Sequence, residues 1–177
     1  MSEDRWSRLE LVWSAAGLAR LTAARVLVVG LGAVGGHCLE ALARAGVGAL
    51  RLIDPDHVEP SNLNRQLLAL EATVGQPKAE LAAARVLAIN AACQVEAHIA
   101  RCGAANAAEL LAGVDLVVDC MDSADDKIDL LLAALAAGVP QVVSLGAALR
   151  RDPTLIRRGP LRAVTVCPLG RRLRTGL

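Results

Sequence analysis

The sequence contains no phenylalanine and no tyrosine, and Trp6 and Trp13 are its only aromatic residues among 177 positions. Because unstacked bases bind on aromatic side chains, we expect any contact with nucleic acid to depend on charge. No two cysteines form a C-x-x-C pair, which argues against a four-cysteine zinc site and a disulfide framework. We therefore expect free thiols in a reducing cytoplasm. The five cysteines are Cys38, Cys93, Cys102, Cys120 and Cys167.

The chain also offers no typical signal or membrane segment. Its N-terminus is charged from the third residue, unlike a secretory signal. One uncharged run, residues 130–149, has the length of a membrane span. Gly138 and Pro140 divide that run, which predicts the end of a helix followed by a buried strand. We expect no membrane segment, and the 54% hydrophobic composition predicts one domain with a substantial core.

Charge is unevenly distributed. Residues 1–149 carry 11 Lys and Arg against 17 Asp and Glu, whereas residues 150–177 carry eight arginines against one aspartate. Such a basic segment suits a polyanionic partner, although composition alone is more typical of a solvated terminus. We therefore divide the chain into a body, residues 1–149, and a basic C-terminal segment, residues 150–177. Its arginines are Arg150, Arg151, Arg157, Arg158, Arg162, Arg171, Arg172 and Arg174.

Strand and helix patterns alternate along the body. Short runs rich in Val, Leu and Ile predict buried parallel strands, and the segments between them have helical spacing. This alternation predicts an α/β fold, a doubly wound, Rossmann-like and mostly parallel sheet with helices on both faces. The predicted strands are 26–29, 49–53, 94–99, 115–120 and 141–144. The predicted helices are a lead-in over 3–21 and segments ending near 45, 90, 111 and 137.

The motif G-L-G-A-V-G lies between the first predicted strand and helix. Gly30 permits a tight turn, Gly32 lets the backbone approach a phosphate, and Gly35 lets the helix pack on the strand. The N-terminus of the helix then offers free N–H groups to the anion. Asp54 ends the next strand, where a carboxylate can accept hydrogen bonds from ribose hydroxyls. The pattern predicts a nucleotide site but does not distinguish NAD from ATP.

The residues after Asp54 favour ATP. Asn62, Arg65, Gln66 and Lys78 follow the carboxyl end of a strand, where open α/β sheets bind ligands. The glycine turn and the N-terminus of the following helix are sufficient to bind the two phosphates of a dinucleotide. Two further cations suit a triphosphate, whose α-phosphate gains negative charge when it is attacked. Either cation alone would be an ordinary surface residue, so the argument depends on their joint spacing.

Two carboxylates follow the fourth predicted strand, in D-C-M-D-S. Asp119 and Asp122 lie at the same edge of the sheet, where a carboxylate facing a triphosphate suits Mg²⁺. Because Asp122 or Ser123 could equally cap the next helix, we assign Asp122 to the metal and Ser123 to the cap.

These motifs resemble the ubiquitin-activating-enzyme-like superfamily, the group of MoeB and ThiF. Its pattern reads here as GLGAVG, Asp54, N-L-N-R-Q over residues 62–66, Lys78 and D-C-M-D over residues 119–122. The resemblance implies ATP-dependent adenylation of a carboxylate, with Arg65 and Lys78 on the phosphates and Asp122 on Mg²⁺. It also implies a homodimer, in which Arg8 of R-W-S-R would reach the partner's ATP site. An amphipathic lead-in helix explains Arg8 equally well.

Within that superfamily the chain is similar to the TcdA (CsdL) branch, the tRNA threonylcarbamoyladenosine dehydratases. The run from Arg25 to Gln66, the D-x-x-D-S motif with a following lysine, and D-P-T-L-I at residues 152–156 carry this similarity. It implies that the carboxylate of the modified tRNA nucleoside attacks ATP and that the activated acyl group is captured by the neighbouring carbamoyl group. With a tRNA substrate implied, the basic segment becomes a candidate phosphate-binding surface.

The chain departs from this branch in its last segment. Pro160 and Ala163 stand where the family has Asp and Lys, and Cys167 replaces the Asp of D-P-L. Relatives continue beyond the position of Leu177. The chain could therefore be a fragment of a longer protein, a short member of the family or an inactive relative. Two other functions also stay open, namely adenylation of a sulfur-carrier protein and nucleotide binding without turnover. A dehydrogenase is disfavoured because no residues resemble a hydride-transfer acid or base.

Overall fold

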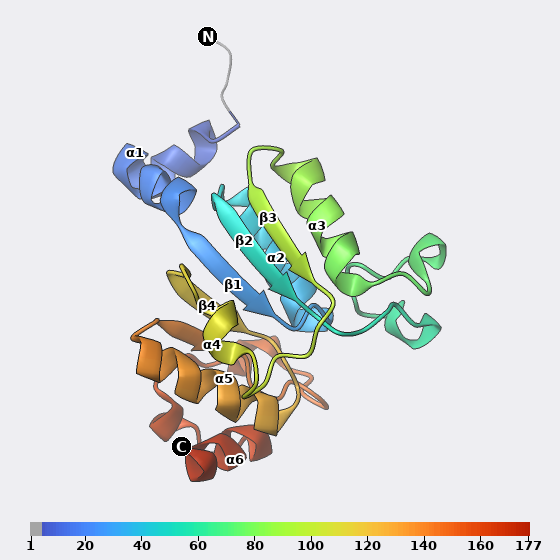
Figure 1. Ribbon diagram of the computed structural model, residues 1–177, viewed down its shortest axis with the longest axis vertical. Coiled ribbons are helices and arrows are strands. Elements are labelled where there is room, and N and C mark those ends of the chain that lie inside the picture. The colour runs from blue at the N-terminus through green and yellow to red at the C-terminus, as the bar shows by residue number, and fades with distance from the viewer. Residues whose placement is uncertain (1–4) are drawn as a thin grey trace.

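The computed structural model describes residues 5–177, and its centre is a five-stranded parallel sheet (Figure 1). The strand order is β3-β2-β1-β4-β5, so the chain crosses from one edge of the sheet to the other side of β1 after β3. In open sheets of this kind, ligands bind at the carboxyl ends of the strands where the order reverses, here between β1 and β4. The strands are β1 (Arg25–Val29), β2 (Ala49–Ile53), β3 (Gln94–His98), β4 (Leu116–Asp119) and β5 (Gln141–Val143).

Helices cover both faces of the sheet, because alternate residues of each strand point to opposite sides. Val26 and Val28 of β1 pack with α2 and α3, whereas Leu27 and Val29 pack with α4 and α5. The predicted doubly wound fold is therefore confirmed, with every strand pair parallel. These helices are α2 (Ala33–Arg44), α3 (Lys78–Ile89), α4 (Ala107–Leu110) and α5 (Ala124–Ala137).

The uncharged run 130–149 is divided as predicted. Helix α5 ends at Ala137, and Gly138 caps it in the left-handed conformation with φ of 67°. Strand β5 then begins at Gln141. No helix within residues 5–177 is both long and apolar enough to cross a membrane.

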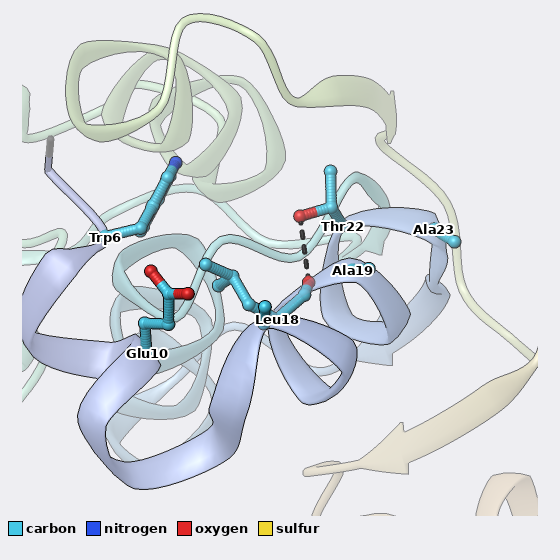
Figure 2. Close-up of a pocket in the computed structure, with 7 residues that line it drawn as sticks. Trp6, Glu10, Leu18, Ala19, Thr22 and Ala23 are labelled. Atoms are coloured by element: carbon cyan, nitrogen blue, oxygen red, sulfur yellow. Dashed lines mark hydrogen bonds between the residues drawn. The ribbon is translucent and has the colours of Figure 1, made fainter.

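The lead-in helix α1 (Ser7–Ala23) lies beyond the amino end of the sheet (Figure 1). The predicted helix started at residue 3, and residues 3 and 4 lie outside the described part. Ser14 breaks the helix with φ of 61° and ψ of 165°, which the helical pattern did not predict. Residues of this segment line an open cavity of about 530 Å³, in which Trp6, Glu10 and Leu18 face one another (Figure 2). Leu11, Val12 and Trp13 are exposed, so α1 presents apolar side chains to its surroundings.

The basic segment consists of turns followed by α6 (Pro168–Gly176), which packs along α5. Asp152 of the D-P-T motif accepts hydrogen bonds from the Thr154 backbone at 2.9 Å and hydroxyl at 2.6 Å, so the motif forms a capped turn. Cys167 caps α6, since its sulfur accepts from the Gly170 N–H at 3.4 Å. The cysteine therefore takes a position where aspartate is a common cap.

An ion pair between Glu40 of α2 and Arg85 of α3 joins these two helices. The Glu40 carboxylate accepts from the Arg44 guanidinium at 2.8 Å and from Arg85 of α3. The hydrogen bond from Arg85 is the main reason that the pKa of Glu40 lies below its ordinary value of 4.5.

We expect Glu40→Gln to lower the free energy of unfolding by about 1 kcal/mol at pH 7, because the mutant loses a charge-assisted hydrogen bond. A carboxylate with a lowered folded-state pKa stabilises above its unfolded pKa, and that contribution disappears as the pH falls through the folded value. Urea unfolding at pH 7 and pH 3 would measure this difference. The exposed Glu109 supplies the control, and an equal effect of Glu109→Gln or a pH-independent difference would contradict the expectation.

Candidate nucleotide-binding site

The glycine turn between β1 and α2 admits no side chain at two positions. Gly30 has φ of 86°, and a Cβ there would lie 2.8 Å from the backbone of Cys120. A Cβ on Gly35 would lie 1.8 Å from the Gly30 carbonyl oxygen. A Cβ on Gly32 would lie 3.8 Å from Nε2 of Gln66, which is an ordinary contact distance. The turn therefore leaves its backbone open to a ligand at Gly32 and brings the predicted Gln66 beside it.

Asp54 holds this turn in place. One carboxylate oxygen accepts from the Leu31 N–H at 2.6 Å, and the other accepts from the Asp56 N–H at 2.9 Å. The residue is only 3% exposed, and this burial raises its pKa, while the two backbone hydrogen bonds oppose the shift. A ribose contact by Asp54 stays a prediction, and the observed contacts give the carboxylate a structural role as well.

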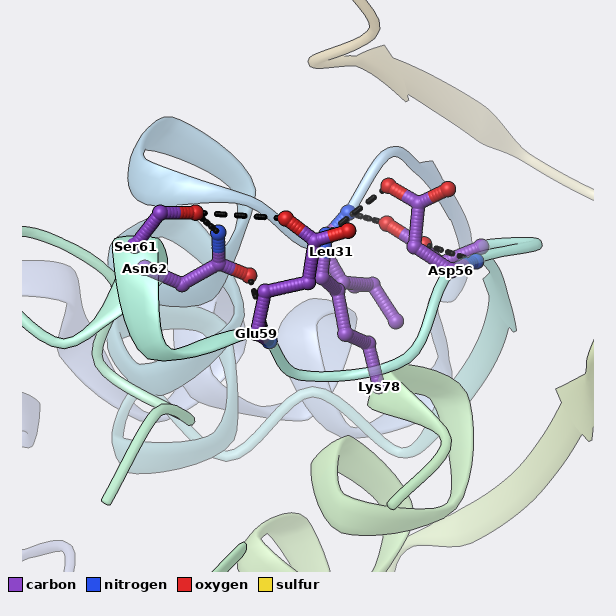
Figure 3. A network of polar contacts seen from close by, with 7 residues as sticks. Leu31, Asp56, Glu59, Ser61, Asn62 and Lys78 are labelled. Atoms are coloured by element: carbon purple, nitrogen blue, oxygen red, sulfur yellow. Dashed lines mark hydrogen bonds and ion pairs between the residues drawn. The ribbon is translucent and has the colours of Figure 1, made fainter. Parts of the chain in front are cut away.

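Lys78 begins α3 and lies at the edge of the same region. Its ammonium group forms an ion pair with Asp56 at 2.8 Å, while its side chain is only 6% exposed. The backbone N–H of Lys78 also donates to the Asp56 carbonyl at 3.0 Å. Asp56 was not among the predicted residues, although its place two residues after Asp54 in D-P-D was a usable signal. The ion pair therefore places Lys78, with its charge balanced by Asp56, next to the glycine turn (Figure 3).

The loop that contains N-L-N-R-Q is held by its own polar groups (Figure 3). Asn62 is buried, accepts from the Glu59 N–H at 3.2 Å and donates to the Ser61 hydroxyl at 3.2 Å. Arg65 is exposed and donates to the Ser61 carbonyl at 2.8 Å. Because a guanidinium carries five N–H donors, Arg65 retains donors for a phosphate. Asn62 positions the loop, and its direct contact with a nucleotide stays a prediction.

A buried ion pair supports the turn after β4. Asp119 and Lys127 of α5 are joined at 2.8 Å with side chains 1% and 0% exposed. Burial raises the pKa of Asp119, and the charge of Lys127 opposes that shift. Sequence reasoning gave Lys127 no role, because a lone lysine on a helix is usually exposed. Asp122 is exposed, and Ser123 caps α5 by accepting from the Asp126 N–H at 3.5 Å, as predicted.

Two buried acceptor atoms in this region have no hydrogen-bond partner among residues 5–177. They are Oε1 of Gln66, which lies beside the glycine turn, and Oδ2 of Asp119, at the carboxyl end of β4. Buried acceptors are normally paired, so both atoms suit donors that a bound molecule brings. No group of three or more His, Cys, Asp or Glu side chains in the described part gathers as a metal cluster.

The predicted residues of the body thus follow the carboxyl ends of β1, β2 and β4, neighbouring strands of one sheet. Arg8 does not join them, because it belongs to α1 beyond the opposite, amino end of the sheet (Figure 1). An Arg8 that reaches an ATP site would therefore have to serve a second copy, as the resemblance implies.

A Rossmann-like sheet with this turn and these polar loops defines a class of nucleotide-binding proteins, and comparison with known proteins identifies the family. The ThiF family model matches residues 5–167, so the chain belongs to the ThiF family. The predicted superfamily resemblance is confirmed.

The chain is similar to curated members of that family. It is 38% identical over 174 residues to a tRNA threonylcarbamoyladenosine dehydratase of Bacillus subtilis, a match that covers 98% of this chain and 68% of the relative. It is 42% identical over 126 residues to a sulfur carrier protein adenylyltransferase of Thermus thermophilus, covering 71% of this chain and 46% of that one. Among solved structures, Escherichia coli TcdA in complex with ATP matches with a TM-score of 0.94 at 35% identity, covering 97% and 71% of the two chains.

Proposed function

We propose that the chain catalyses ATP-dependent adenylation of the carboxylate of tRNA threonylcarbamoyladenosine, followed by cyclising dehydration. The observation that carries the proposal is the match over 97% of the chain to E. coli TcdA, a dehydratase solved with ATP. The site at the carboxyl ends of β1, β2 and β4 fits such a ligand. An open glycine turn, a lysine and two buried acceptors without a partner among residues 5–177 lie along this edge of the sheet.

In this proposal the chain acts by positioning and charge. The N-terminus of α2 and the backbone around Gly32 bind phosphate oxygens. Arg65 and Lys78 stabilise the negative charge that develops when the carboxylate attacks the α-phosphate and pyrophosphate leaves. Asp122 would hold Mg²⁺, which usually takes one or two carboxylates together with phosphate oxygens and supplies charge neutralisation. No nucleophile of the protein is needed, since the carbamoyl group of the substrate itself captures the activated acyl group and releases AMP.

The basic segment is the proposed tRNA contact, and a tRNA substrate implies a cytoplasmic protein. Arg172 of α6 forms an ion pair with Asp125 at 2.7 Å, three residues after Asp122, so this part of the segment lies near the site. Some of its arginines are engaged within the chain, such as Arg150, which donates to the Val166 carbonyl at 3.1 Å. Those that are exposed and available for phosphates include Arg151, Arg158, Arg162 and Arg171.

A homodimer is the proposed assembly. The exposed apolar residues of α1 and the position of Arg8 away from its own site both favour a second copy on that side. A carrier-protein substrate, with a sulfur donor as a further partner, is the second candidate. It is favoured by the 42% identity over 126 residues to the Thermus adenylyltransferase.

ATP–pyrophosphate exchange tests the proposal. We expect exchange with total tRNA, and none with a sulfur-carrier protein or with ATP alone, because only the bound carboxylate can accept the adenylyl group. The measurement follows radioactive pyrophosphate into ATP in three parallel reactions. Exchange that requires the carrier protein would favour the second candidate. ATP binding without exchange in any reaction would indicate a nucleotide-binding protein without turnover.

A further inference from the structure

The backbone that follows β4 is held by the buried ion pair of Asp119 and Lys127. The Lys127 ammonium group lies 2.8 Å from Oδ1 of Asp119 and 3.5 Å from the backbone carbonyl oxygen of the same residue. Oδ1 of Asp119 also accepts a hydrogen bond from the Met121 N–H at 3.0 Å. The carbonyl oxygen of Asp119 accepts a further hydrogen bond from the Ser144 N–H at 2.8 Å. The Asp119 carboxylate therefore connects α5 to the turn after β4, in an orientation that Lys127 fixes.

This turn lies directly against the glycine turn between β1 and α2. A Cβ on Gly30 would lie 2.8 Å from the backbone carbonyl carbon of Cys120 and 2.8 Å from the backbone nitrogen of Met121. The nitrogen that packs on Gly30 is thus the same atom that donates to Oδ1 of Asp119. Because protein interiors are close-packed, a shift of the Met121 backbone toward Gly30 would displace the glycine turn as well.

We propose that Asp119 and Lys127 are positioning residues for the nucleotide. Lys127 orients the Asp119 carboxylate, and the carboxylate fixes the backbone of Met121. That backbone in turn holds Gly30 in the conformation that leaves Gly32 open to a phosphate. The effect does not require either side chain to touch the nucleotide, since both are at most 1% exposed. The inference rests on the proposed function, because it takes ATP as the ligand of the glycine turn.

Two double variants separate positioning from a role in folding alone. Both remove the two charges together, so that neither charge is left unpaired in the interior. Asp119→Asn with Lys127→Met (D119N/K127M) retains a side-chain oxygen that can accept from the Met121 N–H. Asp119→Val with Lys127→Met (D119V/K127M) has no acceptor at this position. The two variants therefore differ in the hydrogen bond that holds the turn.

The ATP affinity of these variants tests the inference. We expect D119N/K127M to bind ATP about tenfold more tightly than D119V/K127M, because a hydrogen bond contributes a factor of about ten. Equilibrium dialysis would measure the affinities at a temperature where thermal unfolding shows both variants to be folded. Arg101→Met is the matched control, since it removes another ion pair of α5, that of Arg101 with Asp126 at 2.9 Å. Its ATP affinity should equal that of the wild type.

Equal ATP affinities of the two folded double variants would overturn the inference. Amide hydrogen exchange of the wild-type chain gives a second test, which does not require a variant to fold. We expect the Met121 amide to be protected and ATP to increase that protection, and an unprotected amide would also overturn the inference. If the wild type binds ATP but catalyses pyrophosphate exchange with no substrate, the proposed function fails. A tighter ATP complex of D119N/K127M than of D119V/K127M would still support positioning by the ion pair.

Discussion

Replacing Lys78 with alanine should abolish ATP–pyrophosphate exchange, a loss of about 10²–10³-fold, because the developing charge on the phosphates loses a preorganised cation. The fold should survive, since the ion-pair partner of Lys78 within residues 5–177 is Asp56, whose side chain is 63% exposed and stays hydrated. Exchange assays with tRNA and circular dichroism of the same preparation would measure both effects. Exchange at the wild-type rate would refute the assignment of Lys78.

Asp122 should behave in the same way, with a matched control three residues away. Asp122→Ala should abolish exchange if this carboxylate holds Mg²⁺, and excess Mg²⁺ should restore part of the activity of Asp122→Asn. Asp125 is also an exposed aspartate, in the first turn of α5, and it forms an ion pair with Arg172. Asp125→Asn should therefore retain most of its exchange activity when tRNA is supplied at a saturating concentration. Equal losses in the two variants would show that exchange depends on the overall negative charge near the end of β4, and they would contradict a role of Asp122 as a metal ligand.

Gly35→Ala should disrupt both stability and ATP binding. The added Cβ would lie 1.8 Å from the Gly30 carbonyl oxygen, a backbone atom that cannot move without opening the turn. We expect a cost of about 3 kcal/mol in the free energy of unfolding and the loss of measurable ATP binding. Thermal unfolding and equilibrium dialysis with ATP would report the two effects.

Gly36 is the control for this substitution, since it is the next residue of the same helix. A Cβ there would meet Leu67 at 3.5 Å, which is an ordinary contact. Gly36→Ala should therefore stabilise the protein by about 0.5–1 kcal/mol through its higher helix propensity, with ATP still bound. Tight ATP binding by Gly35→Ala, or equal damage in both variants, would contradict the close-packing argument.

Local patterns predicted most of the fold, because buried strands such as β1 are continuous apolar runs and helices such as α2 have apolar residues at helical spacing. Strand β2 and the end of α5 lie where the sequence placed them, and glycine or proline residues mark the boundaries. The break at Ser14 was missed, since a serine in a helical pattern gives no signal for a left-handed backbone. Helix α6 was also missed, because its cap is a cysteine in place of the expected aspartate.

Only those site residues that belong to one continuous motif could be predicted from the sequence. The glycine turn, Asp54 and Lys78 each belong to a motif with a definite place relative to a strand. The ion pair of Asp119 with Lys127 joins a strand to a helix, so the spacing of residues could not reveal it. Such partners become visible only when the packing of the helices on the sheet is known.

The buried pair of Asp119 and Lys127 limits which substitutions this chain can accept at the two positions. Removing either partner strands the other as an uncompensated charge inside the protein, which typically costs about 3–5 kcal/mol, whereas exchanging both for apolar residues of similar volume is often tolerated. We therefore expect a single substitution at either position to give a poorly folded protein, and a double substitution by apolar residues to be tolerated.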